Sequence, residues 1–264
     1  MSSLIHLGPL ELAVATLLVV AAGVISVVLG LGIEKRMAIA AIRTVVQLGL
    51  LGLILERVFA LRNPVFVVGI LFLMTLFAAR EAASRTSKGY RGILVDAWLA
   101  MAVSCFAVGG VVTQVVVGVE PWYDPQYVIP LLGMILGNSL TGIALGLDRF
   151  LDHLSTRHAE IELRLAFGAS RREALAAPLR DAVRTGMVPI INGMAAAGIV
   201  SLPGMMTGQI LAGAPPLQAV SYQIVVMFMI AAAVASGAML VVLLAGRHFM
   251  GADAVLRLDR LRAP

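Results

Sequence analysis

Long apolar runs alternate with short polar runs along most of the chain, which is the pattern of a protein that crosses a membrane several times. A helix needs about 20 predominantly apolar residues to cross the hydrocarbon core of a bilayer. The pattern predicts an all-α integral membrane protein that forms a single transmembrane domain over residues 1–264. Its seven predicted spans lie at about residues 10–33, 37–59, 64–79, 92–118, 128–147, 186–213 and 217–246.

The positions of the cations predict how these spans are oriented. Of the 20 Lys and Arg residues, 17 fall in segments that alternation places on one side of the membrane. Arg57 and Arg62 fall on the other side, and Arg43 lies within a span. Cytoplasmic loops carry an excess of cations. The amino terminus is therefore expected outside, and the carboxyl terminus inside.

The longest polar run, residues 149–184, contains seven of the 20 cations and is expected on the cytoplasmic face. Gly168 can end a helix in the left-handed conformation, and Ser170 with Glu173 forms a capping box that begins another. The sequence predicts two short helices that meet at Gly168. We call residues 149–184 the helical elbow. The alternative is a solvated loop between two spans.

The sixth apolar run is expected to be broken, because Pro203 lacks an amide hydrogen and Gly204 loosens the backbone. The break could line a translocation path, or it could be a kinked helix packed through small residues. A re-entrant pair would move the cationic tail to the outer side, so one broken crossing is favoured. The candidate path residues of this segment are Ser201, Pro203, Gly204, Met205, Met206, Thr207 and Gln209.

Polar side chains in two other spans are further candidates. The amide of Asn138 must find hydrogen bonds within lipid, so this residue is expected to point inward. Arg43 costs roughly 2.5 to 3.5 kcal/mol at membrane depth unless it reaches the interface or finds a partner, and Asp96 is a possible partner. The candidates from the second and fifth spans are Arg43, Gln47, Met134, Asn138 and Thr141.

Composition excludes several classes of protein. With 60% hydrophobic and 13% charged residues and a mean hydropathy of +0.96, the chain has too little polar surface for a soluble domain. The net charge of +5 is explained by membrane topology, so nucleic acid is not expected as a partner. Cys105 is the only cysteine, which excludes a disulfide within the chain. An intramembrane enzyme is not favoured, because no pair of buried acids or Ser-His pair is apparent.

Metal and nucleotide chemistry are not expected to reside in this chain. The four histidines, His6, His153, His158 and His248, lie in loops or at helix ends, and none is assigned to a metal. The 13 methionines are scattered over most spans and are explained more simply as packing than as a path for soft metal ions. Neither lysine stands in a G-x-x-x-x-G-K-[ST] context, so no phosphate-binding loop is expected. Any hydrolysis of ATP would then belong to another subunit.

Four segments together resemble the FetB-type permeases, the membrane subunits of bacterial ABC transporters linked to iron export, and the related plant aluminium-tolerance permeases. The segments are IPLLGMILGNS (129–139), LAFGASRREA (165–174), VSLPGMMTGQILAG (200–213) and AVSYQIVVMFMI (219–230). Residues 162–168 also keep the spacing of the E-A-A-x-x-x-G coupling element of ABC permeases, with Leu163 and Arg164 in place of its alanines.

The resemblance implies a multi-pass protein of the bacterial inner membrane, built as two permease copies with two copies of a FetA-like P-loop ATPase. No cofactor would be bound by this chain, and ATP with Mg would sit on the partner subunit. The elbow would couple the two proteins through Glu162, Arg164, Gly168, Ser170, Arg171, Arg172 and Glu173. The transported solute, iron or a related small solute, and the direction of transport stay open. The alternative is a channel or secondary carrier without an ATPase.

Overall fold

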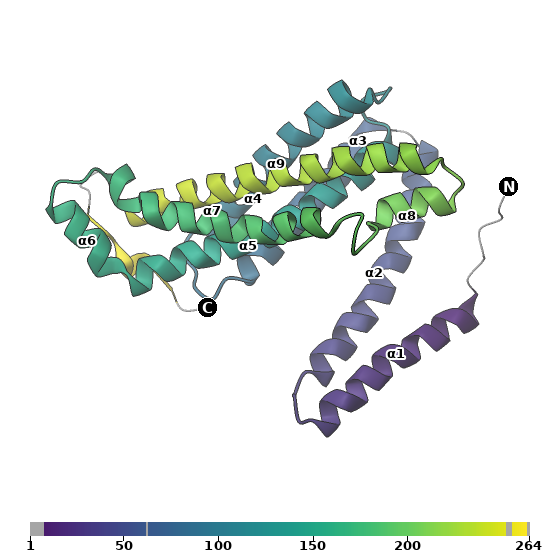
Figure 1. Ribbon diagram of the computed structural model, residues 1–264, viewed down its shortest axis with the longest axis horizontal. Coiled ribbons are helices and arrows are strands. Elements are labelled where there is room, and N and C mark those ends of the chain that lie inside the picture. Colours follow the sequence, from purple (N-terminus) through teal and green to yellow (C-terminus); the bar gives the residue numbers. More distant parts are fainter. Residues whose placement is uncertain (1–7, 62, 252–254, 263–264) are drawn as a thin grey trace. The chain divides into compact units, whose positions relative to one another are not determined.

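A computed structural model describes residues 8–61, 63–251 and 255–262, and nearly all of this chain is helical (Figure 1). It divides into two compact units, one of residues 1–63 with 211–213 and one of residues 64–210 with 214–264. The all-α membrane fold is thus confirmed, whereas the single transmembrane domain stays a prediction.

The first unit contains two antiparallel helices, α1 (Pro9–Val28) and α2 (Glu34–Leu61). The hydroxyl of Ser26 near the end of α1 donates a hydrogen bond of 3.0 Å to Oε2 of Glu34 at the start of α2. Because Ser26 is buried, this bond helps to fix the turn between the two helices.

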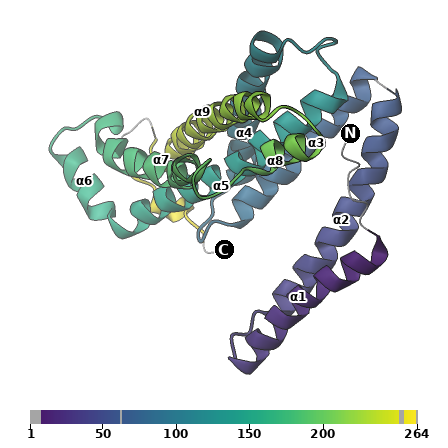
Figure 2. The same ribbon diagram turned by 45° about the vertical axis from the view of Figure 1, so that its right-hand side comes forward.

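The second unit is a bundle in which α5, α7 and α9 contact one another and α3 and α4 complete the packing (Figure 2). Short helices lie among the long ones. The elements in chain order are α3 (Pro64–Ser84), α4 (Ile93–Val111), the π-helix η1 (Val112–Val117), α5 (Pro125–Thr156), α6 (His158–Ala166), α7 (Arg171–Ala196), α8 (Gly204–Leu211), α9 (Pro216–Phe249) and the 3₁₀ helix η2 (Leu258–Arg260).

Within the described ranges, six helical segments are long and apolar enough to cross a membrane. They correspond to six of the seven predicted spans. The remaining one, the sixth in chain order at residues 186–213, is divided between α7 and α8 by an irregular segment at 197–203. The expected break is present. It begins at Ala197, however, and Pro203 immediately precedes α8 instead of interrupting a continuous helix.

Two helices extend farther into polar sequence than predicted. α3 continues past residue 79 to Ser84, and α5 continues past residue 147 to Thr156. α7 begins at Arg171 and is 26 residues long, so the second helix of the elbow is not short. The same helix therefore belongs both to the elbow and to the broken crossing.

Glycines bring the backbones of α5 and α7 into direct contact. A Cβ atom placed on Gly186 would lie 2.5 Å from the carbonyl oxygen of Gly142, and one on Gly142 would lie 2.9 Å from that of Gly186. The Cβ of Ala238 on α9 lies at the same level, 3.3 Å from the Gly186 position. Small residues permit such close approach between membrane helices, where packing drives association.

Replacement of Gly186 by alanine should therefore lower the melting temperature of the detergent-solubilised protein. The added methyl group must push two backbones apart, and such overpacking costs about 1 to 3 kcal/mol. Gly193 is the matched control in the same helix, because nothing lies within 4 Å of its Cβ position. Gly193→Ala should leave the melting temperature unchanged or raise it, and an equal loss in both variants would contradict the close contact.

Candidate functional site

The helical elbow has the predicted local structure. α6 ends at Ala166, Gly168 adopts a φ of 88°, and α7 begins after Ser170. The capping box is formed: the amide of Ser170 donates to Glu173 Oε2 at 2.7 Å, and the amide of Glu173 donates to Ser170 Oγ at 3.4 Å. Hydrogen bonding with Ser170 lowers the pKa of the Glu173 carboxyl. The turn is consequently fixed by local bonds within the chain.

The elbow exposes apolar side chains that the sequence analysis did not select. Ile161 is buried on the inner face of α6, whereas Leu163 is 57% and Phe167 is 84% exposed. Arg164 donates a hydrogen bond of 2.8 Å to Glu160 on the outer face, and Glu162 is also exposed. The sequence signal that could have identified Phe167 is its position, because it is an aromatic residue directly before the glycine of the turn. The exposed side of the elbow thus combines a large apolar group with charges.

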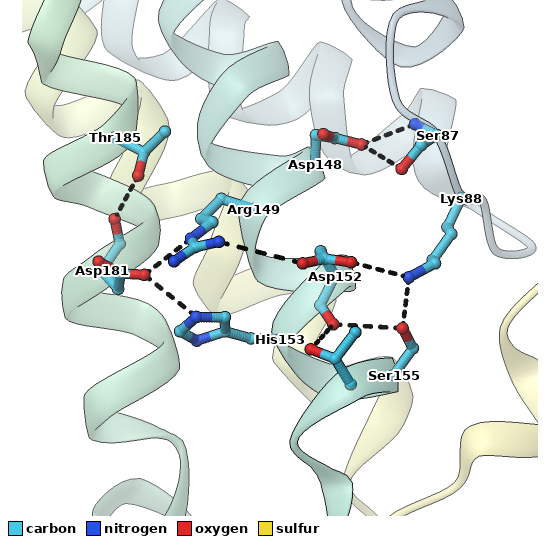
Figure 3. A network of polar contacts seen from close by, with 10 residues as sticks. Ser87, Lys88, Asp148, Arg149, Asp152, His153, Ser155, Asp181 and Thr185 are labelled. Atoms are coloured by element: carbon cyan, nitrogen blue, oxygen red, sulfur yellow. Dashed lines mark hydrogen bonds and ion pairs between the residues drawn. The ribbon is translucent and has the colours of Figure 1, made fainter.

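A network of charged and polar side chains joins α5 to α7 (Figure 3). Arg149 Nε donates to Asp181 Oδ2 at 2.8 Å, across 32 positions of the chain. His153 Nε2 lies 3.1 Å from the same oxygen, close enough for an ion pair but without the alignment of a hydrogen bond. The hydrogen bond and charge of Arg149 lower the pKa of Asp181. Sequence spacing gave no indication of this pairing.

The loop between α3 and α4 is attached to the same end of α5. Ser87 donates to Asp148 Oδ1 from its amide at 2.6 Å and from its hydroxyl at 2.7 Å. Lys88 Nζ donates to Asp152 Oδ1 at 3.0 Å and also to Ser155. These contacts, with the pairing of Arg149 and Asp181, hold three segments at the base of the elbow (Figure 3). The elbow is therefore a supported projection.

Three of the candidate path residues lie on one face of α5. Met134, Asn138 and Thr141 are four and three positions apart, and Asn138 Nδ2 donates to the carbonyl oxygen of Met134 at 2.8 Å. Asn138 is exposed and so does not point inward as expected, because its amide bonds to its own helix; Gly137 is also exposed, and Met134 and Thr141 are half-buried. We call Met134, Gly137, Asn138 and Thr141 the open face of α5, because the rest of the second unit leaves it largely uncovered.

The break after α7 satisfies much of its own backbone. The carbonyl oxygen of Ala196 accepts from the amides of Val200 at 2.9 Å and Ser201 at 3.2 Å, and the amide of Gly198 donates to Ser201 at 2.9 Å. Gly198 has a φ of 82°, which favours glycine. The turn at 197–201 therefore ends α7.

The remaining candidates of the break lie at the start of α8 or within it. Thr207 bonds to the carbonyl of Pro203 through its amide at 3.0 Å and its hydroxyl at 3.2 Å. Oε1 of Gln209 is buried without a hydrogen-bond partner among the described residues. Gly204, Met205 and Met206 form the first turn of α8. α8 thus contains a buried hydrogen-bond acceptor for which the described residues provide no donor.

Arg43 and Gln47 lie four residues apart on an exposed face of α2 in the first unit. Asp96, the partner considered for Arg43, instead accepts a hydrogen bond from Tyr90 and contacts His248. Among the described residues no group of three His, Cys, Asp or Glu side chains could hold a metal ion, and His6 lies outside those residues.

The fold and these sites define a multi-pass, all-α membrane protein with a polar helical projection at one end of its bundle. The chain belongs to the family described as "Uncharacterised protein family (UPF0014)", which it matches over residues 9–250. The expected family is thus confirmed.

Relatives from bacteria and plants align with most of the chain. The UPF0014 membrane protein slr1647 of Synechocystis is 38% identical over 76% of this chain and 78% of its own length. The Probable iron export permease protein FetB of Escherichia coli is 30% identical over 83% of each chain. Protein ALUMINUM SENSITIVE 3 of Arabidopsis thaliana is 30% identical over 86% of this chain and 81% of its own. No solved structure matches the chain.

Replacement of Asp181 by asparagine should lower the melting temperature at neutral pH, because Arg149 and His153 lose their shared carboxylate. A loss of about 1 kcal/mol corresponds to about 2 to 4 °C for a chain of this size. A carboxyl whose folded pKa is depressed stabilises the protein above its unfolded pKa, and this contribution is lost as pH falls through the folded value.

The wild-type advantage over Asp181→Asn should consequently shrink as the pH is lowered below the ordinary carboxyl range. Glu160→Gln is the control, because it removes an exposed pair on one helix whose contribution is only a few tenths of a kcal/mol. Equal melting curves for Asp181→Asn and wild type at neutral pH would show that the network does not support the elbow.

Proposed function

We propose that this protein is the membrane subunit of an ATP-driven transporter and that α7 transmits the action of a separate P-loop ATPase. The observation that carries the proposal is the position of α7, which has the helical elbow at one end and the broken segment at the other. Movement of the elbow would reach the break through one helix.

The dimensions of α7 are consistent with this role. The helix extends 15 residues from Gly186 toward the elbow and ten toward the break, or about 22 Å and 15 Å at 1.5 Å per residue. The glycine contact with α5 lies between these ends and can act as a fulcrum. Alternating access requires two arrangements of packed helices, and a lever of this kind supplies a means to exchange them.

Phe167 is the proposed anchor for the ATPase. Aromatic side chains that enter a partner's pocket carry much of the binding energy of protein interfaces. Here the side chain is 84% exposed and held by the turn at Gly168. Arg164, Arg171 and Arg172 surround the turn in sequence and would face acidic or carbonyl groups of the ATPase. ATP and Mg would be bound by that subunit.

The open face of α5 supports the proposal of a second permease copy. Asn138 would be costly in contact with lipid, even though one of its hydrogen bonds is made within α5. Pairing of two open faces would cover these polar groups and place amide, hydroxyl and thioether groups along a shared path. Iron, named for the E. coli relative, is the first solute to test, with export as the expected direction.

Truncation of Phe167 should separate the chain from its ATPase. Affinity purification of the full chain from its native membranes is expected to retain a P-loop ATPase, identified by mass spectrometry. Phe167→Ala should weaken this association roughly 30-fold, the effect of losing about 2 kcal/mol at an interface centre. ATP hydrolysis that depends on the permease, measured in vesicles holding both proteins, should fall in parallel.

Ile199→Ala is the matched control, because Ile199 is 89% exposed but lies beyond the opposite end of α7. It should retain the ATPase at the wild-type level. Equal retention by Phe167→Ala would reject this residue as the anchor. Solute transport by the chain alone, without ATP, would reject the proposed function and favour a channel or secondary carrier.

A cysteine at position 138 should form a disulfide-linked dimer when membranes are oxidised. The native Cys105 is fully buried and so should not cross-link. Phe72→Cys provides the control, because this half-exposed side chain lies on α3, where its ring packs against Trp98 of α4. Dimers on denaturing gels from Asn138→Cys alone would support the paired arrangement, and dimers from both or neither would contradict it.

A further inference from the structure

A cavity of about 470 Å³ opens where the loop between α3 and α4 meets the end of α9 and residues 255–262, which we call the carboxyl-terminal segment. None of the transport groups described above contributes to it. The lining residues are Tyr90, Arg91, His248, Asp259, Arg260 and Arg262.

Backbone hydrogen bonds build this cavity. The amide of Gly89 donates to the carbonyl of Arg262 at 3.0 Å, and the amide of Arg262 donates to Gly89 at 2.8 Å. Arg260 Nη1 donates to the carbonyl of His248 at 2.7 Å. The carboxyl-terminal segment is thus fastened both to the loop and to α9, which gives the cavity a defined wall.

The floor of the cavity is a buried polar cluster. The Tyr90 hydroxyl donates to Asp96 Oδ2 at 2.7 Å, and His248 Nε2 lies 3.0 Å from the same oxygen. Burial, and next the hydrogen bond to Asp96, raise the pKa of Tyr90, so its hydroxyl stays protonated. Oδ2 of Asp96 is shared by these two partners, and within the described part of the chain no arginine forms an ion pair with Asp96.

The open side of the cavity carries excess positive charge. The guanidinium groups of Arg91 and Arg262 make no hydrogen bond or ion pair with the residues that the structure describes. Besides Asp96 in the floor, the described lining contains one acidic residue, Asp259, against three arginines. Guanidinium groups match phosphate oxygens in geometry and can bind them in pairs of hydrogen bonds.

The cavity also lies at the ends of two candidate membrane spans. Arg91 precedes α4, which begins at Ile93, and His248 is in the last turn of α9, which ends at Phe249. Such a position is the level of lipid headgroups. Basic pockets between membrane helices at this depth are suited to the headgroups of anionic lipids.

We propose that this cavity is a binding site for a phosphate-bearing anion, held by Arg91, Arg260 and Arg262, and that its place at the membrane surface favours an anionic phospholipid headgroup. The ligand would join the loop, α9 and the carboxyl-terminal segment through charge. Binding of an anion at this site requires neither the ATPase nor a particular side of the membrane.

The test uses the full chain reconstituted in phosphatidylcholine vesicles with and without phosphatidylglycerol, then extracted for native mass spectrometry. Wild type should retain phosphatidylglycerol, and Arg91→Gln/Arg262→Gln should retain roughly 30-fold less, as expected for the loss of two interfacial cations. Asp259→Asn should retain more. In a parallel arm, inorganic phosphate is added to lipid-free protein in detergent and the melting temperature is followed.

Arg180→Gln/Arg184→Gln is the control, because it removes the same charge from exposed positions on α7, outside the cavity. Loss of lipid retention confined to Arg91→Gln/Arg262→Gln supports the lipid site. A second outcome is that inorganic phosphate raises the melting temperature of wild type but not of Arg91→Gln/Arg262→Gln, while no lipid is retained. This result supports the same cavity with a soluble ligand. Equal lipid retention and equal phosphate-dependent melting temperatures in the two double variants would overturn the proposal. Equal melting temperatures of the two variants without ligand verify that both fold.

Discussion

The backbone contact between Gly142 of α5 and Gly186 of α7 is the constraint on which the second unit depends. It sets the separation of the two helices and also their register. Asp181 lies five residues from Gly186, and Arg149 lies seven from Gly142, so this register brings the two charges together at 2.8 Å. A side chain at either glycine would move the helices apart and weaken that pairing as well.

Polar groups are concentrated where the helices leave the apolar region. α5 and α7 both continue beyond their apolar parts, and the charged extensions bind one another and the loop between α3 and α4. The elbow projects from this supported base. Its exposed Phe167 and its glycine turn form a rigid surface, and α7 connects that surface with the break at 197–203. Under the proposed function, energy would come from a separate ATPase, and such a connection would carry its action to the break.

The loop between α3 and α4 serves two regions at once. Ser87 and Lys88 bind the extension of α5, whereas Gly89 and Tyr90 bind the carboxyl-terminal segment and Asp96. Binding of an anion beside Arg91 would therefore act close to the base of the elbow. The loop is a physical link between the membrane surface and the part of the chain that we propose to receive the ATPase.

The sequence alone determined the membrane-embedded all-α class, the positions of the long apolar runs, and the glycine turn with its capping box. Those features arise from the length of apolar runs and from short-range bonds, as between Ser170 and Glu173. The tertiary structure alone decided that Asp181 meets Arg149, that Phe167 stays exposed, and that the carboxyl-terminal segment encloses a cavity. It also showed that the break begins at Ala197, where a turn around Gly198 satisfies the backbone before Pro203. Contacts between distant segments depend on helix register, which is set by close packing and leaves no local signal.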